Sequence, residues 1–268
     1  MRDFTPDTLH HLLSALISEG YIFITVAGFL RDPDHKCVIL RHDADARPDN
    51  ALKCAGLENM MGIAGTYYFR TIPGSFDETV IKEIHGLGHE IGYHYEDLSA
   101  ARGDYEKAIR LFEQNLVKLR RIVPVETICM HGSPLSRFDN RKLWEKYDYR
   151  DFGIAGEPYF DIDFEKVLYM TDTGRRWDGE RYRIRDRVAP PEKETIVDTV
   201  EYMALHPVCR STFDIIRVSA AGHLPSKIMM TLHPQRWDDN PLLWLKELLW
   251  QNIKNAGKGI IYRTVIRR

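Results

Sequence analysis

Long hydrophobic runs are absent from this 268-residue sequence. No stretch approaches the roughly 18 apolar residues that indicate a membrane-spanning helix. Residues 1–6 lead directly into a helical pattern and contain no apolar core of a signal peptide. The sequence therefore predicts a cytoplasmic protein without a membrane partner.

An excess of charge of one sign is also lacking. The chain has 37 Lys and Arg residues against 39 Asp and Glu residues, which gives a formal net charge of -2. This balance provides no general attraction for a phosphate backbone, so a nucleic-acid partner is not expected. With 44% hydrophobic and 28% charged residues, the composition is that of a folded globular protein and not of a disordered one.

Cysteine is scarce and dispersed. The four cysteines, Cys37, Cys54, Cys129 and Cys209, include no C-x-x-C pair, and two of them lie inside apolar runs. We therefore expect reduced thiols in the core.

The sequence does contain a regular alternation of short apolar runs and helical patterns. Strands are predicted at residues 37–40, 66–69, 90–93, 127–130, 152–155, 167–171 and 228–232. Helices are predicted at residues 6–19, 48–61, 77–87, 104–122, 140–147, 193–204 and 241–255, and residues 161–191 interrupt the rhythm. The alternation predicts one α/β domain over residues 1–268, a distorted (β/α) barrel of seven or eight mostly parallel strands.

Polar side chains follow several of these strands at their carboxyl ends. The segments are Arg41–Asp45, Arg70, His94–Asp97, His131–Pro134, Glu157, Asp172–Trp177 and His233–Trp237. In parallel α/β folds the loops after the strands open on one face, so we expect these side chains to share one site. Three histidines after three separate strands, with carboxylates nearby, favour function over isolated structural roles.

Asp43 and Asp45 lie two positions apart, so their side chains point the same way if strand geometry continues. Two like charges so close together require a cation or a raised pKa. A zinc ion bound by Asp and His, with an open position for water, would meet this need and lower the pKa of water that attacks a carbonyl. The alternative is that Asp43 and Asp45 cap the helix that begins near Pro48.

These motifs resemble the polysaccharide deacetylase family, the NodB-like carbohydrate esterases. Asp43 and Asp45 are similar to the family's Asp pair, in which the first is the base and the second a metal ligand. Gly88–His94 is similar to the Gly-His-Glu-Ile-Gly segment that leads to a metal-binding histidine, here His94. The Leu232-His233 pair resembles the late element whose histidine is the general acid. The resemblance extends from residue 38 to about residue 235.

Two positions depart from the family pattern. Leu98 occupies the place of the second metal-binding histidine, four residues after His94. His131 is the preferred replacement, because a separate strand can direct it into the barrel mouth, and Asp97 is the neighbouring alternative. His131–Pro134 replaces the family's Arg-x-Pro element, so a backbone amide near Gly132 or Ser133 is the candidate oxyanion donor.

The resemblance implies a metal-dependent hydrolase that removes an acyl group, such as acetyl, from an amino sugar or related amide. Asp43 is the expected base and His233 the acid, with Asp45, His94 and His131 as ligands of a divalent metal such as zinc. The predicted substrate contacts are Arg70, Asp97, Asp172, Arg175, Arg176 and Trp237. Two alternatives stay open: a carbohydrate-binding member without turnover that has lost its metal, and a metal-free hydrolase that uses Asp43 and His233 alone. The sequence defines no oligomeric state.

Overall fold

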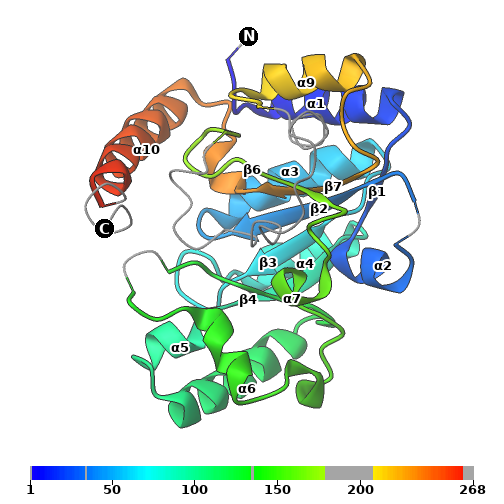
Figure 1. Ribbon diagram of the computed structural model, residues 1–268. Coiled ribbons are helices and arrows are strands. Elements are labelled where there is room, and N and C mark those ends of the chain that lie inside the picture. The colour runs from blue at the N-terminus through cyan, green and yellow to red at the C-terminus, as the bar shows by residue number, and fades with distance from the viewer. Residues whose placement is uncertain (1, 34, 134–135, 179–207, 262–268) are drawn as a thin grey trace, which may run out of the picture.

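The computed structural model describes residues 2–33, 35–133, 136–178 and 208–261, with the side chains of the last helix described as far as Asn255 (Figure 1). Seven strands in this part of the chain form one sheet, in the order β5-β4-β3-β2-β7-β6, with β1 beside β2. They are β1 (Ile22–Ile24), β2 (Cys37–Ala44), β3 (Thr66–Phe69), β4 (Glu90–Tyr95), β5 (Ile128–Met130), β6 (Leu168–Thr171) and β7 (Lys227–Leu232). Every pairing is parallel.

The sheet curls into a partial barrel that helices surround (Figure 1), which confirms the predicted fold class. The helices are α1 (Pro6–Ser18), α2 (Val26–Arg31), α3 (Pro48–Met60), α4 (Glu78–Gly86), α5 (Asp97–Ala100), α6 (Tyr105–Arg120), α7 (Pro158–Asp161), α9 (Thr212–Ala220) and α10 (Pro241–Ile261). Short 3₁₀ helices cover Asn140–Glu145, Tyr149–Phe152 and Pro234–Arg236. The four cysteines are free and buried, as predicted. In the described residues, no helix is both long and apolar enough to cross a bilayer.

Strand β2 lies in the middle of the sheet and is longer than predicted. It continues four residues beyond Leu40, through Arg41, His42 and Asp43 to Ala44, and all eight of its residues are buried. The predicted strand ends at Leu40 because charged residues follow it, and burying an unpaired charge costs free energy. In the structure these charges have partners within the fold, so the strand can carry them to the carboxyl edge of the sheet.

Other sequence predictions need correction. Residues 152–155 form no strand, because Gly153 adopts a left-handed conformation at φ 68° and turns the chain after a 3₁₀ helix. Only an isolated bridge between Thr127 and Gly156 follows. The helix predicted at 140–147 is a shorter 3₁₀ helix, and the one predicted at 193–204 lies outside the described residues. Strand β1 and helices α2, α5, α7 and α9 were not predicted.

Candidate active site

Strand β2 presents Arg41 and Asp43 on one side and His42 on the other. Arg41 Nε and Nη2 each donate to an Asp43 carboxylate oxygen at 2.7 Å, and both side chains are buried. Burial raises the pKa of Asp43, but Arg41, His94 and His233 lower it, so that the net shift is downward. Asp43 is therefore an ionised carboxylate in a fixed orientation. His42 lies 2.8 Å from the Glu58 carboxylate in the core, so it faces away from the site.

Asp45 brings together two of the predicted metal-binding histidines. Its Oδ1 atom lies 3.5 Å from His94 Nε2 and 3.7 Å from His131 Nε2. Asp43 Oδ2 lies 3.7 Å from the same nitrogen of His94. Strands β2 and β4 and the end of β5 supply these residues, so the carboxyl edge of the sheet holds the site, as expected for parallel strands.

The opposite nitrogen of each imidazole has an acceptor. His94 Nδ1 lies 2.9 Å from the Cys129 carbonyl oxygen, and His131 Nδ1 lies 3.0 Å from Glu96 Oε2. Because these partners accept hydrogen bonds, we infer that each neutral ring carries its proton on Nδ1. Both Nε2 lone pairs then face Asp45, which is the arrangement that outer partners impose on metal-binding histidines.

Asp45 Oδ1 is buried and has no hydrogen-bond partner, since 3.5 Å is long for a hydrogen bond. Among the described residues, no group of three or more His, Cys, Asp or Glu side chains is arranged so that it could hold a metal ion as it stands. The two separations nevertheless exceed only slightly the ~3.4 Å between two ligands of a tetrahedral zinc with bonds of about 2.05 Å. The Asp45 oxygen and the two ring nitrogens are thus a candidate ligand set for a divalent ion.

The alternative role of Asp43 and Asp45 as helix caps is wrong. The N-cap position of α3 is Arg47, in a left-handed conformation, and no side chain caps that helix. The two carboxylates instead face the histidines of the neighbouring strands.

His233 follows β7 and pairs with Asp172, which follows β6. His233 Nδ1 lies 2.6 Å from Asp172 Oδ1, and the backbone N–H of His233 donates to Oδ2 at 3.0 Å. Although burial opposes it, Arg236 and His233 lower the pKa of Asp172 to about 2. Strands β2 and β7 pair His42 with Leu232, so His233 follows at the same edge of the sheet as Asp43. His233 also lowers the pKa of both Asp43 and Asp45.

Two predicted substrate contacts are corrected by this arrangement. Asp172 is fully buried, with its oxygens occupied by His233, Arg236 and the Trp237 indole, whose Nε1 donates at 2.8 Å. Trp237 is only 1% exposed, so its ring packs in the core and does not present a face to a sugar. Asp172 positions His233, and Trp237 positions Asp172.

The three arginines predicted as substrate contacts have protein partners. Arg70 pairs with Glu96 at 2.6 Å beside His131. Arg175 is buried between the rings of Phe4 and Trp244. The prediction that Arg175 contacts substrate is therefore corrected. Arg176 pairs with Asp178 at 2.9 Å and stays partly exposed, so its substrate role stays a prediction.

Asp97 does not contact the site and cannot replace the missing histidine. Its carboxylate is buried and accepts hydrogen bonds from Tyr93 Oη and Asn115 Nδ2 in the core. Burial raises the pKa of Asp97 to about 6. The prediction of substrate contact is therefore wrong.

The Asp97→Asn variant should change how stability depends on pH. Between the unfolded pKa near 3.8 and the folded value of about 6, the folded chain binds more protons than the unfolded chain. The free energy of unfolding therefore falls as pH rises through this window, by about 3 kcal/mol from this group. Urea unfolding at several pH values from 4 to 7 should show a flatter profile for Asp97→Asn. The control Asp151→Asn, on the surface, should keep the wild-type slope; equal slopes in all three proteins would contradict the assignment.

The sequence analysis placed Arg41, Glu96 and Arg236 within the strand-end segments but gave them no role, and the structure shows that they position the predicted residues. Arg41 is two positions before Asp43, so strand alternation alone indicated that both lie on one side of β2. Glu96 directly follows β4, yet its contact with His131 depends on a residue 35 positions away. Arg236 gave no comparable local signal.

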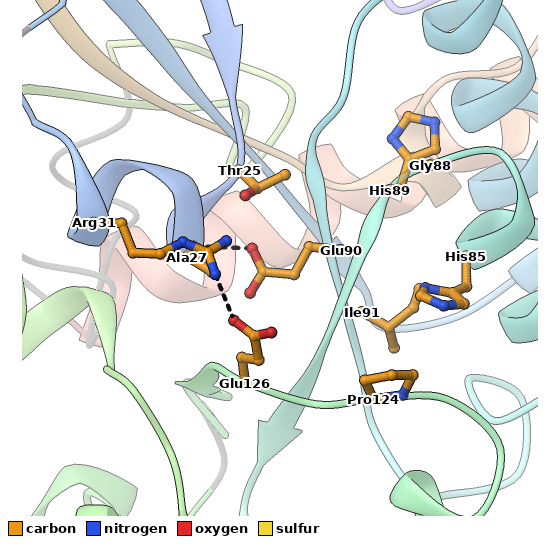
Figure 2. A pocket seen from close by; sticks show the side chains of 10 residues that line it. All are labelled: Thr25, Ala27, Arg31, His85, Gly88, His89, Glu90, Ile91, Pro124 and Glu126. Atoms are coloured by element: carbon orange, nitrogen blue, oxygen red, sulfur yellow. Dashed lines mark hydrogen bonds and ion pairs between the residues drawn. The ribbon is translucent and has the colours of Figure 1, made fainter.

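Much of the family resemblance rests on the Gly88–His94 segment. Its residues before His94 have structural roles. Gly88 turns the chain at φ 90°, and a Cβ at Gly92 would lie 2.2 Å from Tyr68 Cε1. Glu90 is held by Ala27 N–H at 3.0 Å and Thr66 Oγ1 at 2.8 Å. Glu90 lines a cavity of about 260 Å³, and Figure 2 shows its side chain among the other lining residues. Because Glu90 begins β4, this cavity lies at the amino end of that strand, away from the candidate site.

No protein-family model matches the chain, and no curated protein matches it. Among solved structures, the chain is similar to a CE4 family pseudoenzyme from Bacillus anthracis, with 11% identity and a TM-score of 0.42 over 85% of this chain and 63% of that one. It is also similar to a mutant of the peptidoglycan deacetylase PdaC from Bacillus subtilis, with 13% identity and a TM-score of 0.38 over 87% of this chain and 99% of that one. The chain thus spans less than two thirds of the first structure's length.

Proposed function

We propose that this chain is a metal-dependent hydrolase that removes an acyl group, such as acetyl, from an amino sugar or a related amide. The observation that supports it best is the unsatisfied Asp45 carboxylate oxygen between the free ring nitrogens of His94 and His131. The Arg41–Asp43 pair and the Asp172–His233 pair flank this group. The resemblance of the motifs to polysaccharide deacetylases agrees with the same chemistry.

Asp45, His94 and His131 are the residues that would hold the ion. Two histidines and one carboxylate, with a position left open, form the ligand set of several catalytic zinc sites. When bound, the metal would supply Lewis-acid activation of the acyl carbonyl and of water. Glu96 and the Cys129 carbonyl would orient the two rings through their Nδ1 atoms.

Asp43 is the proposed general base. Arg41 keeps its carboxylate ionised and fixes its direction, so it can accept a proton from the water that attacks the carbonyl. Its Oδ2 atom lies 3.7 Å from His94 Nε2, beside the proposed metal site. Base and metal ligands are therefore separate side chains on one edge of the sheet.

His233 is the proposed general acid. Asp172 accepts from its Nδ1, which orients the ring. The protonated Nε2 can then donate to the departing amine, so that the amine leaves as a neutral group.

The decisive experiment is hydrolysis of a panel of N-acetylated sugars by the purified chain, with and without a chelator. We expect acetate release that a chelator abolishes and zinc or cobalt restores, together with a higher melting temperature in the presence of the ion. A protein that binds no divalent ion, and gains no thermal stability from one, would instead be the carbohydrate-binding member without turnover. Activity that resists the chelator would favour the metal-free hydrolase.

The Glu96→Gln variant should weaken metal binding without unfolding the site. Although burial opposes it, His131 and Arg70 lower the pKa of Glu96 to about 2, so it is a charged acceptor for His131. Loss of that charge should reduce zinc affinity by roughly 10- to 100-fold, measured by competition with a coloured chelator. Glu126→Gln breaks an Arg–Glu pair at the opposite end of the strands and should bind zinc as the wild type does. Unchanged affinity in Glu96→Gln would exclude this positioning role.

A further inference from the structure

Glu157 is a fully buried carboxylate that the proposed reaction does not use. Its side chain is 0% exposed. Oε1 accepts from the Met130 backbone N–H at 3.0 Å and from Tyr95 Oη at 3.4 Å. Oε2 accepts from the Tyr159 backbone N–H at 2.5 Å. Because Met130 is the last residue of β5, these bonds fix the carboxylate near the carboxyl edge of the sheet.

Tyr159 connects this carboxylate to the arginine that holds Asp43. Arg41 Cζ lies 5.3 Å from the centroid of the Tyr159 ring, which is within the range of a cation–π contact. Glu157 is the N-cap of α7, and it caps that helix through the Tyr159 N–H. The carboxylate therefore helps to hold the tyrosine ring against the guanidinium group of Arg41.

The guanidinium group of Arg41 has one donor that Asp43 does not use. Nε and Nη2 both donate to Asp43, whereas Nη1 is buried and has no hydrogen-bond partner. Buried donors without a partner are rare in native proteins, and each calls for an explanation. Glu157 is close enough for the charge of Arg41 to lower its pKa. Arg41 thus lies between two carboxylates, of which it binds only Asp43 directly.

The surroundings of Glu157 let it change charge near neutral pH. The ionisable residues that face it are two arginines, three tyrosines and one aspartate, namely Arg41, Arg141, Tyr95, Tyr149, Tyr159 and Asp161. Burial raises the pKa of Glu157 to about 7, because the two arginines and the backbone donors offset the burial only in part. Burial also raises the pKa values of Tyr95 and Tyr149, so these phenols stay neutral in the same range.

The charge of Glu157 bears on how strongly Asp43 binds a proton. Two charge-assisted hydrogen bonds from Arg41 stabilise the ionised form of Asp43 and so reduce its affinity for a proton. A general base works best when its proton affinity suits the working pH. A second negative charge beside Arg41 weakens the attraction of Arg41 for Asp43, which makes Asp43 the stronger base.

We propose that Glu157 is a positioning residue that, when ionised, strengthens Asp43 as the general base by drawing on the charge of Arg41. The proposal rests on the proposed function, in which Asp43 accepts a proton from water. No proton passes between the two carboxylates, because Glu157 exchanges its proton with solvent and acts on Asp43 through charge alone. Hydrolysis should therefore increase by roughly 3- to 10-fold as pH rises through the range in which Glu157 ionises.

The test is the pH dependence of kcat/KM for acetate release, from about pH 5.5 to about pH 9. Zinc is kept saturating, so that protonation of the ligand histidines does not limit the rate. Glu157→Gln should match the wild type at low pH and lack the increase through pH 7. The matched control Asp161→Asn changes a carboxylate of the same helix, which accepts from the Glu157 N–H at 2.7 Å, and should keep the increase. A decrease by one factor at every pH in Glu157→Gln would show a merely structural role and overturn the inference.

Carbon-13 NMR of the carboxyl groups provides a readout that needs neither metal nor turnover. In the metal-free wild type, the Asp43 signal, identified by its loss in Asp43→Asn, should shift with the same midpoint as one glutamate signal near pH 7. Glu157→Gln should lack both changes. If Glu157→Gln does not fold, the wild type decides alone, and an Asp43 signal that is constant from pH 6 to pH 8 overturns the inference. An inactive chain with the linked shift would refute the proposed function alone, and an active chain without it would refute this inference alone.

Discussion

Replacing Asp45 with Asn should abolish metal binding and hydrolysis together. The carboxylate oxygen of Asp45 is buried, has no hydrogen-bond partner, and faces the free nitrogens of His94 and His131. A neutral amide of the same shape removes the one negative charge among the three proposed ligands. We expect zinc affinity to fall by more than about 100-fold, beyond the usual effect of losing an outer partner of a ligand. Competition with a chelator measures affinity, and acetate release measures turnover.

The control for this variant is Asp49→Asn, which changes a carboxylate in the first turn of α3, away from the histidines. It should keep wild-type affinity and activity. If Asp45→Asn binds zinc as the wild type does, Asp45 is no ligand and the proposed site is wrong. Without metal, Asp45→Asn should melt below Asp49→Asn: although burial opposes it, His131 and His94 hold the pKa of Asp45 well below its usual range, and the neutral amide loses that attraction.

Replacing Asp43 with Asn should separate the two properties: the variant should still bind metal but lose hydrolysis. A general base contributes roughly 10²- to 10⁴-fold to the rate, so acetate release should fall by that factor while zinc affinity changes little. Arg41 would be left buried without its ionised partner, which should cost about 3–5 kcal/mol of stability. Activity and urea unfolding therefore have to be measured on the same preparation, at a temperature where the variant is folded.

A double variant separates the two effects. Arg41→Met together with Asp43→Asn removes both members of the buried pair, and such replacements are often neutral for stability. It should therefore recover much of the lost stability but none of the activity. Recovery of hydrolysis together with stability would show that Asp43 supports folding and is not the base.

The pH profile offers a further check on Asp43. Its pKa is lowered, so the stability from its pairing with Arg41 is present above the unfolded value near 3.8 and is lost as pH falls through the lower folded value. Loss of activity between pH 5 and pH 7 would therefore have to come from another group.

The sequence alone was enough to place most of the strands and the central residues of the candidate site. Apolar runs with parallel-sheet character placed β3 correctly, most of β4 and β7 and the first half of β2, and polar residues after the strands indicated a shared edge. Strand alternation also assigned His42 to the opposite side from Asp43. The preference for His131 over Asp97 as the third candidate ligand rested on one rule: residues that follow different parallel strands lie at the same edge of the sheet.

Only the tertiary structure determined which residues contact these side chains, because the contacting residues come from distant parts of the chain. Asp172 and His233 are 61 positions apart, and no local pattern shows that one orients the other. The sequence also did not show that Trp237, an expected sugar contact, packs in the core. Nor did it show that Glu96 accepts a hydrogen bond from His131. The sequence predicts a helix at residues 241–255, but only the contacts with Gly174 and Arg175 determine how α10 packs.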